Sequence, residues 1–192
     1  TINSKWINTG PKELRFRELI KKRFKSKYAV ATNSGTSSLR CALASLGVGS
    51  GDEVISTPYT WLATNTAILE QGAKPVFADI NYDDLNISAK DVEKKITKKT
   101  KAIICVHYAG NAVEIEKLSK IANKHKIPLI EDCAHAMGSE YKGKPIGSSG
   151  NVCCFSFQCV KIVTCGDGGA ITCNNKKIYD KLQSKIWYGF NK

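Results

Sequence analysis

The sequence has no apolar run long enough to cross a bilayer. A membrane-spanning helix needs about 18 to 20 predominantly apolar residues, and nothing of that kind occurs. Residues 1–6, TINSKW, also lack the charged and then apolar order of a secretory signal. These features predict a cytoplasmic protein. With 192 residues, the chain is long enough to form one domain with a sizeable core.

Two familiar ligand-binding patterns are missing as well. None of the eight cysteines forms a C-x-x-C pair, so the sequence does not predict a structural zinc site. Residues 33–38, NSGTSS, lack the G-K-[ST] ending of a Walker loop. Because no secretory signal is seen, we expect the thiols to be reduced.

Acidic residues are scarce, with 17 against 29 basic ones and a net charge of +12. Such a charge can attract nucleic acid. The basic residues are spread over predicted helix faces and interleaved with acidic ones, which favours solvated surfaces. We therefore expect neither nucleic acid nor a membrane as partner. A nucleic-acid-binding module, which rests on charge alone, is the last alternative.

Short apolar runs alternate with amphipathic segments along the chain. The strands are predicted at residues 28–32, 53–56, 74–79, 101–107, 127–131, 152–157 and 169–173. The helices are predicted at residues 11–24, 39–46, 61–71, 88–96, 113–125 and from 175 to the end of the chain at 192. This alternation predicts an α/β domain with a mostly parallel sheet.

In such sheets, ligands bind at the carboxyl ends of the strands. The polar and aromatic residues predicted at those ends are Gly35, Thr36, Trp61, His107, Asp132 and His135. The hydroxyl-rich turn around Gly35 precedes a helix, whose free N–H groups and dipole can bind an anion. A plain serine or threonine N-cap is the alternative there. Trp61 can cover a planar ligand or belong to the core.

One lysine follows the strand predicted at residues 152–157. Ser156 precedes Lys161 by five positions, and the glycine-rich segment 166–169 comes next. A lysine near a strand end is usually a solvated surface group. Together with the carboxylate of Asp132 and a phosphate-sized turn, however, Lys161 matches a pyridoxal phosphate (PLP) site.

Several motifs together resemble the sugar aminotransferases of the DegT/DnrJ/EryC1/StrS group. They are SGT at 34–36, TPYTW at 57–61, HYAGN at 107–111, EDCAHA at 131–136, SFxxxK at 156–161 and GDGG at 166–169. The resemblance runs in the family's order from Gly10 to Cys173. It implies a three-layer α/β/α domain with a mixed, mostly parallel sheet, the large domain of PLP-dependent transferases of fold type I. Residues 1–192 would be this domain, with 1–25 as a helical arm on the substrate side and the C-terminal small domain absent.

The resemblance also implies roles for individual residues. Lys161 would bind the cofactor covalently and later move a proton. The dehydratase branch of the family carries histidine at this position. Asp132 would pair with the pyridine nitrogen, and Trp61 would stack on the ring. Gly35, Thr36 and Ser156 would hold the phosphate. His135, at a position more often occupied by glutamine, would lie near the cofactor's 3-oxygen.

The implied activity is transfer of an amino group from an amino acid, glutamate by expectation, to a nucleotide-linked keto-sugar. This reaction would serve amino-sugar or surface-glycan biosynthesis, in a homodimer. Tyr59 and the segment from Trp6 to Gly10 are expected to contact the substrate.

Two other functions stay open at this point. A chain of about half the family's length could be a truncated, non-catalytic fragment or a dimerising pseudoenzyme. Cys159 and Cys165 flank the lysine, and a cysteine desulfurase would need one of them as a mobile nucleophile.

Overall fold

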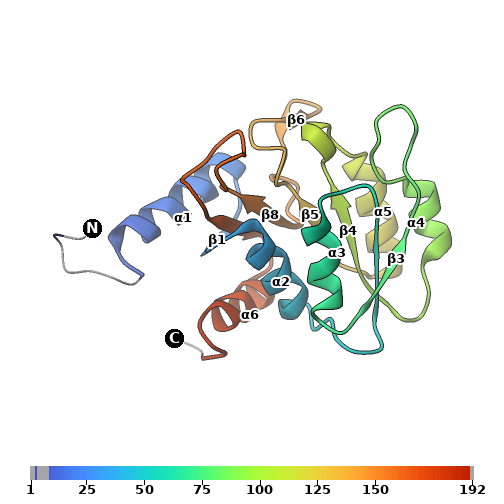
Figure 1. Cartoon of the computed structure of the whole chain (residues 1–192), viewed down its shortest axis with the longest axis horizontal. Coiled ribbons are helices and arrows are strands. Elements are labelled where there is room, and N and C mark those ends of the chain that lie inside the picture. Colours follow the sequence, from blue (N-terminus) through green and yellow to red (C-terminus); the bar gives the residue numbers. More distant parts are fainter. Residues whose placement is uncertain (1–2, 4–8, 191–192) are drawn as a thin grey trace.

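A computed structural model describes residue 3 and residues 9–190 of the chain (Figure 1). Its main sheet has seven strands in the order β1-β9-β8-β5-β4-β2-β3. These strands are β1 (Tyr28–Thr32), β2 (Glu53–Ser56), β3 (Lys74–Phe77), β4 (Thr100–Val106), β5 (Leu129–Asp132), β8 (Val152–Ser156) and β9 (Gly169–Cys173). A short hairpin, β6 (Glu140–Tyr141) with β7 (Lys144–Pro145), lies apart from it.

The helices alternate with the strands along the chain. They are α1 (Pro11–Phe24), α2 (Gly35–Ser45), α3 (Leu62–Leu69), α4 (Ala89–Lys95), α5 (Ile115–His125) and α6 (Lys176–Ile186), and a 3₁₀ turn, η2 (Tyr108–Gly110), follows β4. Within the described residues, no helix combines the length and apolarity needed to cross a membrane.

The sheet is mixed but mostly parallel. β9 pairs antiparallel with both β1 and β8, whereas β2, β3, β4, β5 and β8 pair in parallel. Since β1 and β8 both oppose β9, they run in the same direction. The carboxyl ends of all strands except β9 therefore meet at one edge of the sheet.

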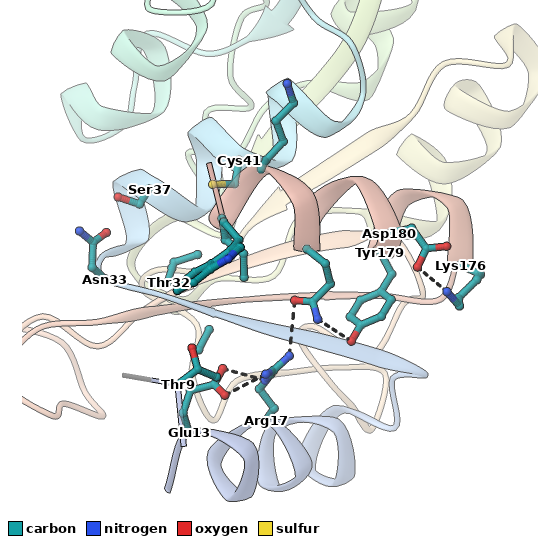
Figure 2. A pocket seen from close by; sticks show the side chains of 15 residues that line it. Thr9, Glu13, Arg17, Thr32, Asn33, Ser37, Cys41, Lys176, Tyr179 and Asp180 are labelled. Carbon is teal, nitrogen blue, oxygen red and sulfur yellow. Dashed lines mark hydrogen bonds and ion pairs between the residues drawn. The ribbon is translucent and has the colours of Figure 1, made fainter. Parts of the chain in front are cut away.

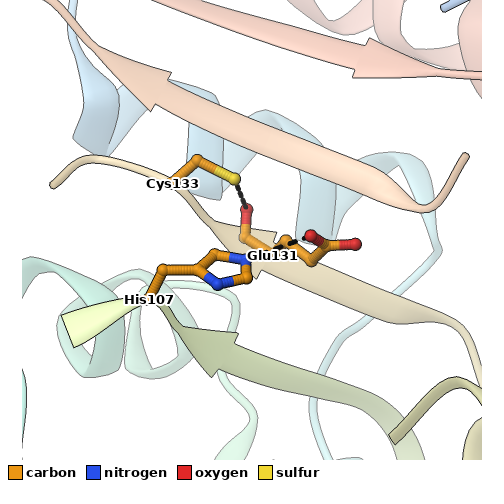
Figure 3. Close-up of side chains that lie close together, drawn as sticks. All are labelled: His107, Glu131 and Cys133. Atoms are coloured by element: carbon orange, nitrogen blue, oxygen red, sulfur yellow. Dashed lines mark hydrogen bonds and ion pairs between the residues drawn. The ribbon is translucent and has the colours of Figure 1, made fainter. Parts of the chain in front are cut away.

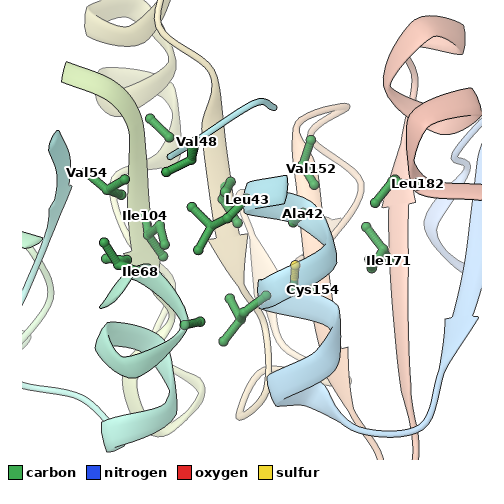
Figure 4. Packing of buried hydrophobic residues seen from close by; sticks show 14 of the residues in the cluster. Ala42, Leu43, Val48, Val54, Ile68, Ile104, Val152, Cys154, Ile171 and Leu182 are labelled. Carbon is green, nitrogen blue, oxygen red and sulfur yellow. The ribbon is translucent and has the colours of Figure 1, made fainter. Parts of the chain in front are cut away.

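Helices cover both faces of the sheet and enclose separate parts of the core. On one face, Leu43 of α2, Ile68 of α3 and Leu182 of α6 pack on strand residues such as Ile104 and Ile171 (Figure 4). On the other face, α4 and α5 cover β2, β4 and β5, and α1 covers β1, β8 and β9. Burial of these apolar surfaces is the main force that holds the three layers together.

The structure confirms the three-layer arrangement and most predicted elements. The bounds of α1, β1, β2 and β9 agree with the sequence analysis. The helix predicted from Leu39 begins earlier, at Gly35, because the Ser34 side chain accepts a hydrogen bond from the backbone N–H of Ser37 and caps it. The prediction that the last helix continues to the end of the chain was wrong, since α6 ends at Ile186 and Tyr188 and Gly189 have positive φ.

Candidate active site

A cavity of about 780 Å³ opens at the carboxyl ends of the strands. Residues following β1, β2, β4, β5 and β8 line it, as expected where ligands bind to parallel sheets. All of the residues predicted to bind the cofactor lie in its wall: Gly35, Thr36, Trp61, Asp132, His135, Ser156 and Lys161. The fold thus brings together residues that lie up to 126 positions apart (161 − 35 = 126).

The turn between β1 and α2 forms one end of the cavity. Ser34 caps α2, and the first turn of this helix, with Gly35 and Thr36, faces the cavity. A Cβ atom on Gly35 would lie 2.6 Å from Cβ of Ser156, so a larger residue cannot occupy position 35 without displacing Ser156. Close packing here places a serine hydroxyl beside a helix N-terminus, an arrangement suited to a phosphate group.

Asp132 is the carboxylate of the cavity. It ends β5 and is only 5% exposed. Its Oδ1 accepts a hydrogen bond from the N–H of Ala134 at 3.1 Å, and its Oδ2 accepts one from the hydroxyl of Thr64 at 2.9 Å. A buried carboxylate held on both oxygens offers a fixed acceptor to a ligand in the cavity.

Lys161 lies in the loop between β8 and β9. The loop folds back on Phe157, whose carbonyl accepts hydrogen bonds from the Thr164 hydroxyl at 2.9 Å and the Cys165 N–H at 3.1 Å. The backbone N–H of Lys161 donates to the carbonyl of Gln158 at 2.8 Å. Lys161 is half-buried and lines the cavity, so it is not the fully solvated surface lysine that was the alternative.

His135 is partly buried in the cavity wall. Burial lowers the pKa of its imidazole, the positive charge of Lys161 lowers it further, and Asp132 opposes both effects. The imidazole is therefore neutral near pH 7 and can donate one hydrogen bond and accept another.

Aromatic side chains surround the mouth of the cavity. Trp61 is 72% exposed, so the interpretation of this residue as a core tryptophan was wrong. Tyr59, expected to contact the substrate, lies against Tyr108 with ring centroids 4.5 Å apart, and both line the cavity. Their hydrogen bond raises the pKa of Tyr59. Residues 6–8 of the other expected contact segment, Trp6 to Gly10, lie outside the described residues.

His107 directly follows β4, as expected, but it does not line the cavity with the other site residues. It is completely buried with Glu131 and Cys133 (Figure 3). Its Nδ1 accepts from the N–H of Val113 at 3.2 Å, so the ring proton is on Nε2 and points to Oε2 of Glu131 at 3.1 Å.

The group of His107, Glu131 and Cys133 has the residue types of a metal site, but its atoms are already bonded. The other oxygen of Glu131 accepts from Ser149 and from Asn151, the latter at 2.8 Å. Burial raises the pKa of the Cys133 thiol well above its ordinary value. A protonated thiol and an imidazole bonded at both nitrogens are poor ligands, so the group is a structural hydrogen-bond network.

A second cavity, of about 1160 Å³, lies between α1, β1, α2 and α6 (Figure 2). Four of its charged side chains are paired, Arg17 with Glu13 at 2.7 Å and Lys176 with Asp180, and Lys185 lines it as well. It is larger than the first cavity, but it contains none of the predicted cofactor-binding residues, and its wall does not combine an amine with a buried carboxylate. Thr9, from the segment expected to contact the substrate, lines this second cavity and not the first.

Some cavity residues were not found from the sequence. Thr64, Tyr108, Gln158 and Asp167 all line the cavity. Thr64 reads as an ordinary helix residue in the sequence, and only its contact with Asp132 distinguishes it. Tyr108 could have been found, because it directly follows a predicted strand.

Comparison with known proteins identifies the class to which this fold and cavity belong. The structure of DesV from S. venezuelae, in complex with a ketimine intermediate, superposes with a TM-score of 0.96 at 33% identity, covering 100% of this chain and 52% of that one. The structure of NtdA from Bacillus subtilis, with bound cofactor PMP, superposes with a TM-score of 0.92 at 30% identity, and the match covers 100% of this chain and 43% of NtdA. The structure of DesI in the presence of its TDP-sugar product superposes with a TM-score of 0.93 at 33% identity, and the match covers 98% of this chain and 48% of DesI. The fold is that of the large domain of PLP-dependent aminotransferases.

The family is shown by the sequence itself. The profile of the DegT/DnrJ/EryC1/StrS aminotransferase family matches residues 1–192, and the chain belongs to this family. An uncharacterised protein of Methanocaldococcus jannaschii, MJ1066, is 45% identical over 192 residues, which are 100% of this chain and 50% of that protein. The chain thus spans about half the length of this relative.

Proposed function

We propose that this chain binds PLP and provides the cofactor site of an aminotransferase. The observation that carries the proposal is that Lys161, Asp132 and the Gly35–Thr36 turn line the same cavity. An amine, a buried carboxylate and an anion-binding helix start are the groups needed for the aldehyde, the ring nitrogen and the phosphate of this cofactor.

The dimensions of the cavity fit the cofactor. A volume of about 780 Å³ lies within the range of small-molecule sites. The missing side chain at Gly35 leaves room beside Ser156 that a Cβ would fill, which lets a phosphate approach both the hydroxyl and the helix N-terminus. Ser156, Gly35 and Thr36 would hold that group.

The remaining residues would orient the ring. Trp61 at the cavity mouth would cover one face, Asp132 would accept a hydrogen bond from the ring nitrogen, and neutral His135 would bond the ring oxygen. When bound, PLP supplies an electron sink for negative charge at the α-carbon of an amino acid. Lys161 would hold the cofactor covalently at rest and, once released, move a proton to and from that carbon.

For the substrates, we propose an amino-acid donor, glutamate, and a nucleotide-linked keto-sugar as acceptor. The family and the TDP-sugar product named with DesI support this choice. The product would be an amino sugar for glycan biosynthesis.

We further propose the molecular setting of this reaction. Residues 1–192 would be the large domain, with 1–25 as an arm on the substrate side and the remaining length of the relatives as a small domain. The protein would act in the cytoplasm. It would form a homodimer, since large apolar side chains near the cavity mouth are exposed, among them Trp61, Leu62 and Ile162.

A spectroscopic experiment tests the proposal. Mixing the protein with PLP should produce an absorbance band near the visible, and borohydride treatment should attach the cofactor permanently to Lys161, as seen by peptide mass spectrometry. Lys161→Ala should abolish both signals, because the covalent link needs its amine. Lys181→Ala, which replaces an exposed lysine of α6, serves as the control. A band that persists in Lys161→Ala would contradict the assignment.

A second experiment separates an aminotransferase from a non-catalytic fragment. A non-catalytic fragment or scaffold, suggested by the half-length match, would convert no donor even if it bound the cofactor. A panel of amino donors and keto-sugar nucleotides, tested on the protein expressed from its complete reading frame, distinguishes it from an aminotransferase. The desulfurase alternative is disfavoured, because neither Cys159 nor Cys165 is among the residues that line the cavity.

A further inference from the structure

A threonine on α3 contacts the carboxylate of the cavity. Thr64 is the third residue of the helix and is only 1% exposed. Its Oγ1 lies 2.9 Å from Oδ2 of Asp132, although the two residues are 68 positions apart in the sequence. A buried hydroxyl without a hydrogen-bond partner is unfavourable, and the fold gives this hydroxyl an acceptor on β5.

The direction of the hydrogen bonds follows from counting protons. An ionised carboxylate can only accept, so the single hydroxyl proton of Thr64 must be donated to Asp132. The hydroxyl of Thr60 lies 3.0 Å from that of Thr64 and must then be the donor between the two. The resulting relay runs from Thr60 to Thr64 to Asp132.

The relay restricts the rotation of the carboxylate. Thr64 on α3 holds Oδ2, and the N–H of Ala134 in the turn after β5 holds Oδ1. These donors come from different elements, so the plane of the carboxylate is fixed relative to the cavity. Each carboxylate oxygen has two acceptor positions, and the donors above use one of them on each oxygen. One position on each oxygen is therefore free to bond a ligand.

We infer that Thr64 is a positioning residue that orients Asp132 toward the cofactor's ring nitrogen. This inference rests on the proposed function. Thr64 acts through Asp132, so its loss should change how firmly the ring is held and how readily its nitrogen keeps a proton. A hydrogen bond to a charged group contributes about 1.5 to 3 kcal/mol, which corresponds to roughly a tenfold or greater change in an equilibrium constant.

The test compares Thr64→Val, Thr64→Ser and Thr66→Val in the protein expressed from its complete reading frame. Valine keeps the shape of threonine and removes the hydroxyl, whereas serine keeps the hydroxyl. The hydroxyl of Thr66, on the same helix, donates to the carbonyl of Ala63 at 3.3 Å, and Thr66 does not line the cavity, so it is the matched control. Circular dichroism confirms that each variant is folded.

The readouts are the dissociation constant of PLP, the pH at which its bound absorbance band changes, and kcat and KM separately. Thr64→Val should raise the dissociation constant by about tenfold, shift the pH midpoint and lower kcat more than it changes the KM of the amino donor. The dissociation constant of PLP should stay within about threefold of the wild-type value in both Thr64→Ser and Thr66→Val. If Thr64→Val does not fold, Thr60→Val should show a smaller shift in the same direction.

Two results would overturn the inference alone: a wild-type spectrum and affinity in Thr64→Val, or failure of Thr64→Ser to restore them. In both cases the wild-type band would still support the proposed function. Absence of any band in the wild-type protein would instead overturn the proposed function and this inference with it.

Discussion

At the scale of single residues, charge and burial decide how the candidate site behaves. Lys161, Asp132 and His135 lie in one cavity, and the charges of the first two act on the third in opposite directions. Burial has the largest effect and favours the uncharged imidazole. His135 is therefore the residue whose titration reports on the electrostatics of the cavity before any ligand binds.

This coupling gives a prediction that does not depend on activity. Removing the charge of Lys161 by Lys161→Met should raise the pKa of His135 in the cofactor-free protein. The pKa should still stay below its ordinary value of 6.5, because the effect of burial remains. Histidine proton shifts followed by NMR measure it, with His135→Gln to assign the signal.

Lys22→Met, a change on the exposed surface of α1, should leave that titration unaltered. An unchanged or lower pKa of His135 in Lys161→Met would show that the two side chains are not electrostatically coupled.

At the scale of elements, the ends of β4 and β5 are joined by a buried polar network. Glu131 accepts hydrogen bonds from His107 on one oxygen and from Ser149 and Asn151 on the other. Burial raises the pKa of Glu131, but these hydrogen bonds outweigh it and the net pKa lies below its ordinary value of 4.5. The network therefore holds the loop before β8 against the strand that carries Asp132.

The lowered pKa fixes the sign of a pH effect on stability. A carboxyl whose folded pKa lies below its unfolded value stabilises the protein above the unfolded value, and this contribution is lost as the pH falls through the folded value. At neutral pH, Glu131→Gln should lower the free energy of unfolding by about 1.5 to 3 kcal/mol. The deficit should narrow below pH 4.5, measured by urea unfolding at a series of pH values.

Glu116→Gln is the matched control, because Glu116 is exposed and forms an ion pair with Lys142 at the surface. The free energy of unfolding of Glu116→Gln should remain close to the wild-type value. A deficit of Glu131→Gln that stays constant from pH 7 down to about pH 3 would contradict the assigned role of the charge.

The elements also show how far sequence patterns could reach. Apolar periodicity located the strands of the main sheet and the helices, because burial on one face dictates it. It did not predict β6 and β7, which are only two residues each and carry no period. It placed the start of α2 too late, since small hydroxyl residues suit a turn and a helix start equally, and the Ser34 cap decides between them.

At the scale of the whole molecule, exposed apolar side chains gather near the mouth of the cavity. Trp61 and Leu62 lie at the start of α3, and Val160 and Ile162 lie on either side of Lys161 in the loop after β8. Leu62 is 69% and Ile162 is 75% exposed. Such a surface is unfavourable in water, and association with a second copy would bury it.

Sedimentation velocity tests this proposal. The wild-type protein should sediment as a dimer at micromolar concentration, and Ile162→Asp should shift it toward the monomer, because a buried unpaired charge opposes association. Leu19→Asp, at an exposed position on α1, should leave the dimer intact. A wild-type protein that stays monomeric at all concentrations would contradict the homodimer.

The order of residues alone predicts the alternation of strands and helices, the family, and the set of residues at the carboxyl ends of the strands. Which of these residues enter the cavity depends on the face of the sheet to which each side chain points. Glu131 and Asp132 are neighbours on β5, but successive strand residues point to opposite faces of a sheet. Glu131 therefore faces the layer of α1, α4 and α5 together with His107, while Asp132 faces Thr64 on α3. The sequence predicts the composition of the site, and the position of α3 over the face that carries Asp132 decides which carboxylate belongs to it.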